Sequence, residues 1–258
     1  MTQDEIKFQK LRRFNIVMGV LHTIQGILML AFTNDFAVPF TTNFLKFDEI
    51  NETVYHNMNE LWEIQLGPAV ALFMFMSAFA HFSVSTYGYG WYQRKLKEGI
   101  NPARWYEYAV SSSWMILIVA MLSGLTDLAA LILLVGLNAS MNLFGMMMEL
   151  HNKELKKTNW SSFIYGSIAG TLAWVAVLMY FLGAILDNFD NVPNFVYMVV
   201  FVLLFFWGTF PLNMWLQYRR KGRWADYLYG EKVYILLSLV SKSALAWFIF
   251  FGVQGIGS

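Results

Sequence analysis

The sequence predicts an all-α membrane protein, a bundle of seven transmembrane helices, from its composition and from the length of its apolar runs. Of its 258 residues, 57% are hydrophobic and 14% are charged, whereas charged residues make up about a quarter of a typical soluble domain. The apolar residues fall into runs of about 20 without the alternation of a strand, which is the length that a helix needs to cross a bilayer. Lipid is therefore the expected surrounding of most of the chain.

Seven apolar runs follow one another along the chain. Their predicted limits, in chain order, are 14–32, 66–88, 103–122, 128–148, 163–186, 195–216 and 233–253. Residues 1–7 have neither an apolar core nor a small-residue cleavage site, so we expect the first run itself, and not a removed signal peptide, to direct the chain to the membrane. Residues 1–258 are predicted to form one domain.

Lysine and arginine gather on one side of this predicted bundle. With seven spans, the N-terminal segment lies on the same side as the second, fourth and sixth connections, and these segments hold 16 of the 18 basic residues. Of the other two, Lys46 lies in the first connection and Lys242 lies deep in the last span. Connections rich in Lys and Arg stay in the cytoplasm. We therefore predict a multi-pass protein of the cell membrane with a cytoplasmic N-terminus and an extracellular C-terminus.

The first connection, residues 33–62, is the long one. It alternates apolar and polar residues and contains Pro39 and several asparagines. A connection of this length seldom lacks secondary structure. We predict an extracellular lid over the outer face, with a β-hairpin as its form, and a loose loop is the alternative.

Four ionisable side chains fall inside the apolar runs: Lys242, Glu107, His22 and His81. Such a side chain at mid-membrane costs about 2.5–3.5 kcal/mol on insertion scales, so it indicates a functional site. At a rise of about 1.5 Å per residue from the helix ends, all four are expected in the cytoplasmic half of the bundle. The alternative for Lys242 is a structural ion pair or a side chain that extends to the interface. The alternative for each histidine is a hydrogen-bonded packing role.

Short polar residues lie one helical turn from three of these groups, in the pairs Ser238 and Lys242, Glu107 and Ser111, and Ser77 and His81. An amine in an apolar pocket can condense with an aldehyde to form a Schiff base, and the protonated form needs a fixed counterion. Glu107 is the candidate counterion, because Glu149 and Glu63 lie at the ends of their helices. Aromatic residues in the last three spans suit a long polyene, with packing as the alternative for each: Trp174, Phe206, Trp207, Phe210, Trp247 and Phe248.

Two segments carry a resemblance to a known family. The third span contains Arg-Trp-Tyr-Glu-Tyr at residues 104–108, followed by three serines at residues 111–113. The seventh contains Ser-Leu-Val-Ser-Lys-Ser-Ala-Leu-Ala-Trp at residues 238–247. In these segments and over most of its length the chain resembles the heliorhodopsins. The predicted cytoplasmic N-terminus agrees, since other microbial rhodopsins have the opposite orientation.

The resemblance implies a rhodopsin-like bundle in which Lys242 binds all-trans retinal as a protonated Schiff base, Glu107 is the counterion and Ser238 bonds near the Schiff base. It places His22 and His81, with Ser77, in a polar cavity on the cytoplasmic side. The other candidate retinal-binding residues are Tyr108, Ser111, Ser112, Asn138, Met141, Phe206, Trp207 and Phe210. Met214 stands where a glutamine is found elsewhere in the family, which leaves colour tuning open. The family also implies a homodimer with residues 33–62 as its outer lid.

Three functions compete for such a bundle. A light-driven pump needs proton-relay groups on both sides of the Schiff base, and residues 115–122 in the outer half of the third span contain no carboxylate or histidine. We therefore predict a slow photosensory receptor without net ion pumping, which reports to an unidentified cytoplasmic partner. A light-driven or light-gated proton transporter is the alternative.

The third function, an enzyme or solute transporter without a chromophore, lacks sequence support. The chain has no cysteine, no His-Glu-x-x-His motif and no paired aspartates, so disulfides, thiolate chemistry and a metal site of these kinds are excluded. No catalytic residue and no nucleic-acid partner are predicted.

Overall fold

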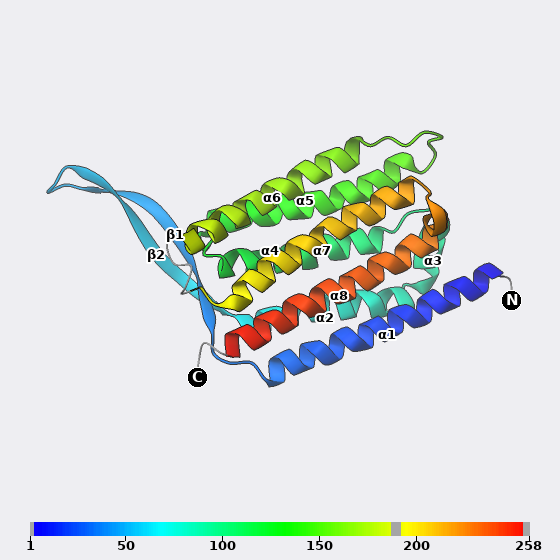
Figure 1. Cartoon of the computed structure of the whole chain (residues 1–258), viewed down its shortest axis with the longest axis horizontal. Helices are drawn as coiled ribbons and strands as arrows, with labels where there is room; N and C mark the ends of the chain where they lie inside the picture. Colours follow the sequence, from blue (N-terminus) through cyan, green and yellow to red (C-terminus); the bar gives the residue numbers. More distant parts are fainter. Residues whose placement is uncertain (1–2, 187–191, 255–258) are drawn as a thin grey trace.

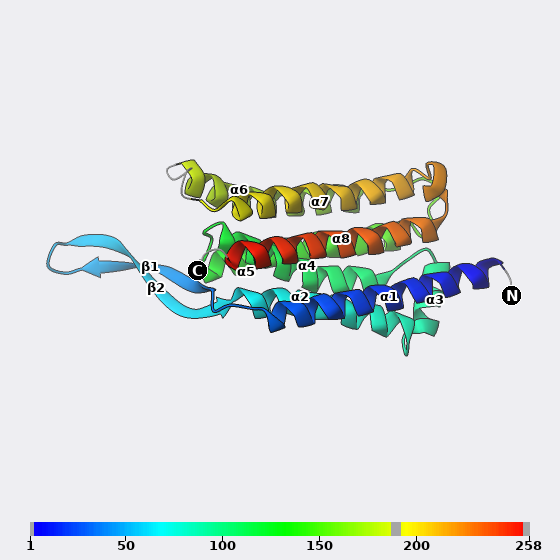
Figure 2. The ribbon, with the colours of Figure 1, turned by 60° about the horizontal axis from the view of Figure 1, so that its bottom comes forward.

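The structure is a computed structural model that describes residues 3–186 and 192–254. Within these residues, seven helices are long and apolar enough to cross a membrane. They are α1 (Gln3–Ala31), α2 (Leu66–Ser85), α4 (Pro102–Leu122), α5 (Leu128–Asn152), α6 (Ser161–Leu186), α7 (Asn194–Tyr218) and α8 (Tyr227–Gln254). The helices lie side by side in one bundle (Figure 1), as the sequence predicts, and the same arrangement is seen in the turned view (Figure 2).

The helices extend beyond the apolar runs at the end of the bundle where the N-terminus lies, here called the N-terminal end. α1 begins at Gln3 and α8 at Tyr227, ahead of the predicted limits at 14 and 233. The predicted limits followed hydropathy, but polar residues can continue a helix once it leaves the lipid. At the same end, α4 begins beside Asn101, whose side-chain oxygen accepts a hydrogen bond from the backbone N–H of Arg104.

A short helix, α3 (Tyr89–Lys97), lies at the N-terminal end and was not predicted. It follows α2, which ends at Ser85 and not at the predicted residue 88. Its buried face, Tyr92 and Leu96, packs with Phe8 and Leu11 of α1. Hydropathy does not detect such a helix, because only two of its nine residues are buried and its last turn carries three cations. A single 3-10 turn, η1 (Gly222–Ala225), connects α7 to α8.

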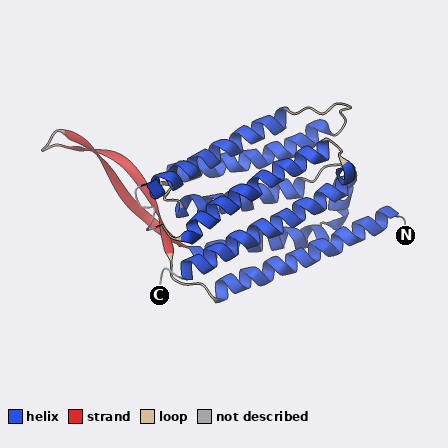
Figure 3. Cartoon of the chain, in the orientation of Figure 1, coloured by secondary structure: helices blue, strands red, loops and turns tan. Residues whose placement is uncertain are grey.

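The long first connection is an antiparallel β-hairpin made of β1 (Ala37–Asp48) and β2 (Thr53–Gln65), drawn in red in Figure 3. Only its base rests on the helices: Phe40 is buried, and the backbone N–H of Thr41 donates to the carbonyl of Thr126 at 2.9 Å. The distal part projects away from the bundle (Figure 2) and exposes its apolar side chains. Only the base of the hairpin therefore lies where a lid over the outer face was expected. That this part acts as a lid stays a prediction.

The interior differs between the two ends of the bundle. Toward the end that carries the hairpin, here called the hairpin end, buried apolar side chains form one large cluster, to which the second half of α4 contributes residues 115–121. Buried polar and charged side chains, among them Arg104, Glu149 and Glu231, lie nearer the N-terminal end. The large apolar side chains exposed on the outside of the helices, such as Leu133 and Phe205, suit contact with lipid.

Candidate functional site

Lys242 meets Glu107 and Ser77 inside the bundle, where α8, α4 and α2 face one another. Lys242 Nζ donates to Glu107 Oε1 at 2.6 Å and also to Ser77 Oγ. Ser77 Oγ in turn donates to Glu107 Oε1 at 2.7 Å. The Lys242 side chain is only 3% exposed and that of Glu107 is 11% exposed. A buried cation and a buried carboxylate are thus paired, and each offsets the cost of removing the other from water.

Two further polar residues lie one turn from this pair. Ser111, one turn beyond Glu107 on α4, is fully buried. Ser238, one turn before Lys242 on α8, is also buried, and its carbonyl accepts a hydrogen bond from Ser241 Oγ at 3.2 Å. The ring of Tyr108 lies 5.5 Å from Lys242 Nζ, close enough for a cation–π contact. The lysine nitrogen therefore contacts a carboxylate, the Ser77 hydroxyl group and an aromatic face.

The two predicted cavity histidines stack on each other. The rings of His22 on α1 and His81 on α2 are 5.6 Å apart and inclined by 12°. His81 Nδ1 is 2.8 Å from Asn15 Oδ1, whereas His22 Nδ1 is 3.4 Å from Met74 Sδ. His81, Ser77 and Glu107 line a polar cavity at the N-terminal end, while His22 lies behind His81 and does not line it.

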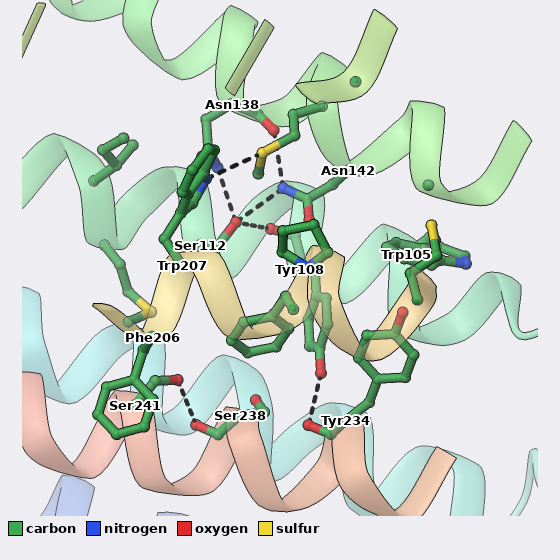
Figure 4. A pocket seen from close by; sticks show the side chains of 18 of the residues that line it. Trp105, Tyr108, Ser112, Asn138, Asn142, Phe206, Trp207, Tyr234, Ser238 and Ser241 are labelled. Carbon is green, nitrogen blue, oxygen red and sulfur yellow. Dashed lines mark hydrogen bonds between the residues drawn. The ribbon is translucent and has the colours of Figure 1, made fainter. Parts of the chain in front are cut away.

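A second, larger cavity runs between α4, α5, α6, α7 and α8, with Lys242 in its wall. The cavity has a volume of about 150 Å³. A single water molecule needs roughly 10–15 Å³, so the space can hold a molecule much larger than water. The predicted residues that line it are Tyr108, Ser112, Asn138, Met141, Trp174, Phe206, Trp207, Phe210 and Ser238. Figure 4 shows many of their side chains turned toward one another around this space. Ser111 and Glu107 lie outside its lining.

Two predicted aromatic residues do not belong to this cavity. Trp247 Nε1 donates to Gln25 Oε1 of α1 at 3.2 Å, so its ring lies between α8 and α1. Phe248 packs against the apolar cluster of the hairpin end. Neither residue lines the cavity, so the structure favours packing, the stated alternative, for Trp247 and Phe248.

A hydrogen-bonded network holds one wall of the larger cavity in place (Figure 4). Asn138 Nδ2 donates to Ser112 Oγ at 2.8 Å, and Asn142 Nδ2 donates to the same oxygen at 3.0 Å. Trp207 Nε1 points to Met141 Sδ at 3.3 Å. Glycines allow close packing here, since a Cβ on Gly170 would lie 2.3 Å from Met141 Sδ and 2.9 Å from the Trp207 ring. The walls of this cavity thus combine aromatic rings with one primary amine, that of Lys242.

The family model for heliorhodopsin matches residues 11–254, nearly the whole chain. The chain belongs to the heliorhodopsin family. Heliorhodopsins are light-sensing rhodopsins that bind retinal, and the seven apolar helices agree with a multi-pass membrane protein of this family. A search of curated proteins gave no match.

In this heliorhodopsin, sequence reasoning missed several residues that line the larger cavity. Trp105, Asn142, Tyr234 and Ser241 all line it, as does Met214, which the family resemblance had connected only with colour tuning. Tyr108 Oη donates to the carbonyl of Tyr234 at 3.1 Å, which fixes the α4 ring against α8 (Figure 4). Helical spacing could have identified two of them, because Ser241 is next to Lys242 and Asn142 lies one turn after Asn138.

Sequence reasoning also missed a buried ion cluster in this heliorhodopsin. Arg104 was counted among the basic residues of the cytoplasmic side and Glu149 was placed at a helix end, but both are buried and pair with each other. Glu231, which is fully buried, pairs with the same arginine. The available signal was the presence of two carboxylates and one arginine near the same end of three different spans.

Proposed function

We propose that this heliorhodopsin is a photosensory receptor in which Lys242 holds all-trans retinal as a protonated Schiff base and Glu107 is the counterion. The observation that carries this proposal is the 2.6 Å contact between Lys242 Nζ and Glu107 Oε1 beside a cavity walled by aromatic rings. Retinal, when bound, supplies light absorption and an isomerisation that displaces charge next to Glu107. Ser77 and Ser238 stabilise the charged nitrogen, and the rings of Phe206, Trp207 and Phe210 keep water from the polyene.

The proposal excludes net ion pumping. Its support is the apolar interior toward the hairpin end, where residues 115–121 of α4 are buried and contain no ionisable side chain. A proton relay through a membrane requires Asp, Glu or His along the way. A proton displaced at Glu107 would instead meet His81 and the polar cavity, and return from the same side.

A light-driven or light-gated proton transporter is the second candidate. The stacked His22–His81 pair beside the Lys242–Glu107 pair favours it, because proton relays inside a membrane are built from Asp, Glu and His side chains. The sensor and the transporter share Lys242 and Glu107 and differ in whether a proton crosses the whole bundle.

The proposal further includes a non-enzymatic single-domain protein of the cell membrane with its N-terminus in the cytoplasm. It also includes a homodimer, an outer lid formed by the hairpin and an unidentified cytoplasmic signalling partner. Support for the orientation comes from the 16 basic residues on the predicted cytoplasmic side. The dimer is supported by the family resemblance, the lid by that resemblance and by the length of residues 33–62, and the partner follows only from the proposed sensory function.

One experiment tests the proposal and separates the two candidates. The protein is expressed with all-trans retinal, its visible spectrum is recorded beside that of Lys242→Ala, and external pH is followed in the same illuminated cells with and without a protonophore. We expect a visible band that is lost in Lys242→Ala, and no light-driven pH change. A pH change that the protonophore abolishes would favour the transporter. The absence of any band in the wild type would contradict retinal binding at Lys242.

A further inference from the structure

The ion cluster at the N-terminal end is separate from the Lys242–Glu107 pair. Arg104 of α4 pairs through Nη2 with Glu149 of α5 and through Nη1 with Glu231 of α8. The three side chains are 5%, 2% and 0% exposed, respectively. Charges buried this deeply are tolerated only when they are paired and hydrogen-bonded. The cluster therefore has to balance its charge internally.

The two carboxylates of the cluster differ in how many hydrogen bonds they accept. Glu149 accepts four, from Arg104 Nη2, Tyr227 Oη at 3.0 Å, Trp105 Nε1 at 2.7 Å and the backbone N–H of Asn101 at 2.8 Å. Glu231 accepts two, from Arg104 Nη1 and from Asn101 Nδ2 at 2.6 Å. Since donors stabilise the ionised form of a carboxyl group, Glu149 is the partner that holds the negative charge opposite Arg104.

The charges of the cluster do not balance if both carboxylates are ionised. Among the contacts of Glu149 and Glu231 in the described part of the chain, the only cation is Arg104. The Lys242–Glu107 pair is already neutral and supplies no spare positive charge. A buried group avoids an unpaired charge by taking up a proton. Glu231, which has fewer donors and is fully buried, is where that proton is best held.

Glu231 also shares a cavity with the counterion candidate. The polar cavity at the N-terminal end is lined by both Glu231 and Glu107. Its volume is about 50 Å³, which is room for a few water molecules at roughly 10–15 Å³ each. The other polar side chains that face it are Asn15 of α1, Ser77 and His81 of α2, Tyr92 of α3, Asn101 before α4, Arg104 and Tyr108 of α4, and Ser238 of α8. A change of charge at Glu107 can thus reach Glu231 through hydrogen-bonded water.

We propose that Glu231 is protonated in the dark and that this cavity couples its carboxyl group to charge changes at Glu107. Glu231 then carries the light signal to Arg104, and so to the first turns of α4 and α8 and the last turn of α5, which meet at the N-terminal end of the bundle. The protonated dark state depends only on the cluster. The light-dependent half rests on the proposed retinal site.

Infrared absorption of the protein in an ester-free detergent tests the dark state, both with and without retinal. We expect a carboxylic acid C=O band that shifts in D₂O, is lost in Glu231→Gln and moves in Glu231→Asp. Glu149→Asp and the exposed control Glu63→Gln should leave the band in place. The proposal is overturned if the wild type has no such band, if Glu231→Gln retains it, or if only Glu149→Asp moves it.

Light-induced infrared difference spectra test the coupling in the protein loaded with retinal. We expect the Glu231 band to shift on illumination in the wild type and in Glu63→Gln, and the signal to be lost in Glu231→Gln while the visible band remains. A visible band and a photoreaction without any change at the Glu231 band would overturn the coupling. A failure of retinal binding would appear instead as a missing visible band, with the dark infrared band unaffected.

Discussion

Lys242, Glu107 and Ser77 form a closed hydrogen-bonded triangle, in which the lysine and the serine both donate to one carboxylate oxygen. The charges of the triangle cancel, which makes it tolerable among apolar helices. A positive charge on the Lys242 nitrogen is most stable in this position, beside the Glu107 carboxylate. Removing the carboxylate while keeping its shape leaves that charge without a partner.

Glu107→Gln is the substitution that isolates this effect. A carboxylate beside a cation typically shifts a titration by about one to three pH units. In the variant loaded with retinal, we therefore expect the visible band of the protonated form to be lost at a pH lower than in the wild type by roughly one to three units. Spectra recorded over a pH series measure the midpoint, and Glu63→Gln in the exposed hairpin serves as the control. An unchanged midpoint in Glu107→Gln would show that another group is the counterion.

At the scale of residues, the sequence indicated the lysine and the glutamate more clearly than their surroundings. Lys242 and Glu107 stood out because ionisable side chains are rare within apolar runs. Trp247 was misplaced because apolar residues cover every face of α8, and hydropathy then contains no signal for how the helix is rotated. The Arg104 cluster was missed because a charge near a helix end looks the same in sequence whether it faces water or the bundle.

At the scale of elements, glycines decide how closely α5 approaches α4. Gly145 of α5 faces the ring of Trp105, and a Cβ there would lie 2.3 Å from the ring. The ring cannot move aside freely, because its Nε1 donates to Glu149 Oε2 at 2.7 Å. The contact therefore connects helix packing to the ion cluster at the N-terminal end.

Gly145→Ala tests this packing, with Gly136→Ala on the same helix as its matched control. The added methyl group must displace Trp105, and overpacking of this kind costs about 1–3 kcal/mol. We expect Gly145→Ala to unfold at a lower temperature in detergent than the wild type. Gly136→Ala should not, since a Cβ at that position has no neighbour within 4 Å. Equal stability of the two variants would mean that the Trp105 ring is not held as described.

The sequence predicted the long helices and the hairpin better than the short connections. Apolar runs of membrane length and strand-like alternation are periodic signals that survive over many residues. α3 has only two buried residues in nine, so its sequence shows no periodic pattern of apolar residues. Its position depends on contacts with Phe8 and Leu11, which are distant in the chain. The projection of the hairpin away from the bundle likewise follows from its anchoring at Thr41 and Thr126, which pattern alone does not reveal.

At the scale of the whole molecule, charge and shape make the two ends of the bundle distinct. The N-terminal end carries α3 and the connection between α5 and α6, with the lysines at positions 153, 156 and 157. The opposite end carries the projecting hairpin, whose single cation is Lys46. By the positive-inside rule, this charge distribution supports the proposed cytoplasmic position of the N-terminal end.

Single cysteines test this orientation directly, because the chain has no cysteine of its own. Glu49→Cys places a thiol in the exposed hairpin turn, and Lys156→Cys places one in the exposed connection between α5 and α6. In intact cells, a membrane-impermeant maleimide should label Glu49→Cys and leave Lys156→Cys unlabelled, and both should react after permeabilisation. The wild type gives the background. Labelling of Lys156→Cys but not Glu49→Cys in intact cells would invert the bundle, and would place the His81 cavity and the Glu231 cluster toward the outside of the cell.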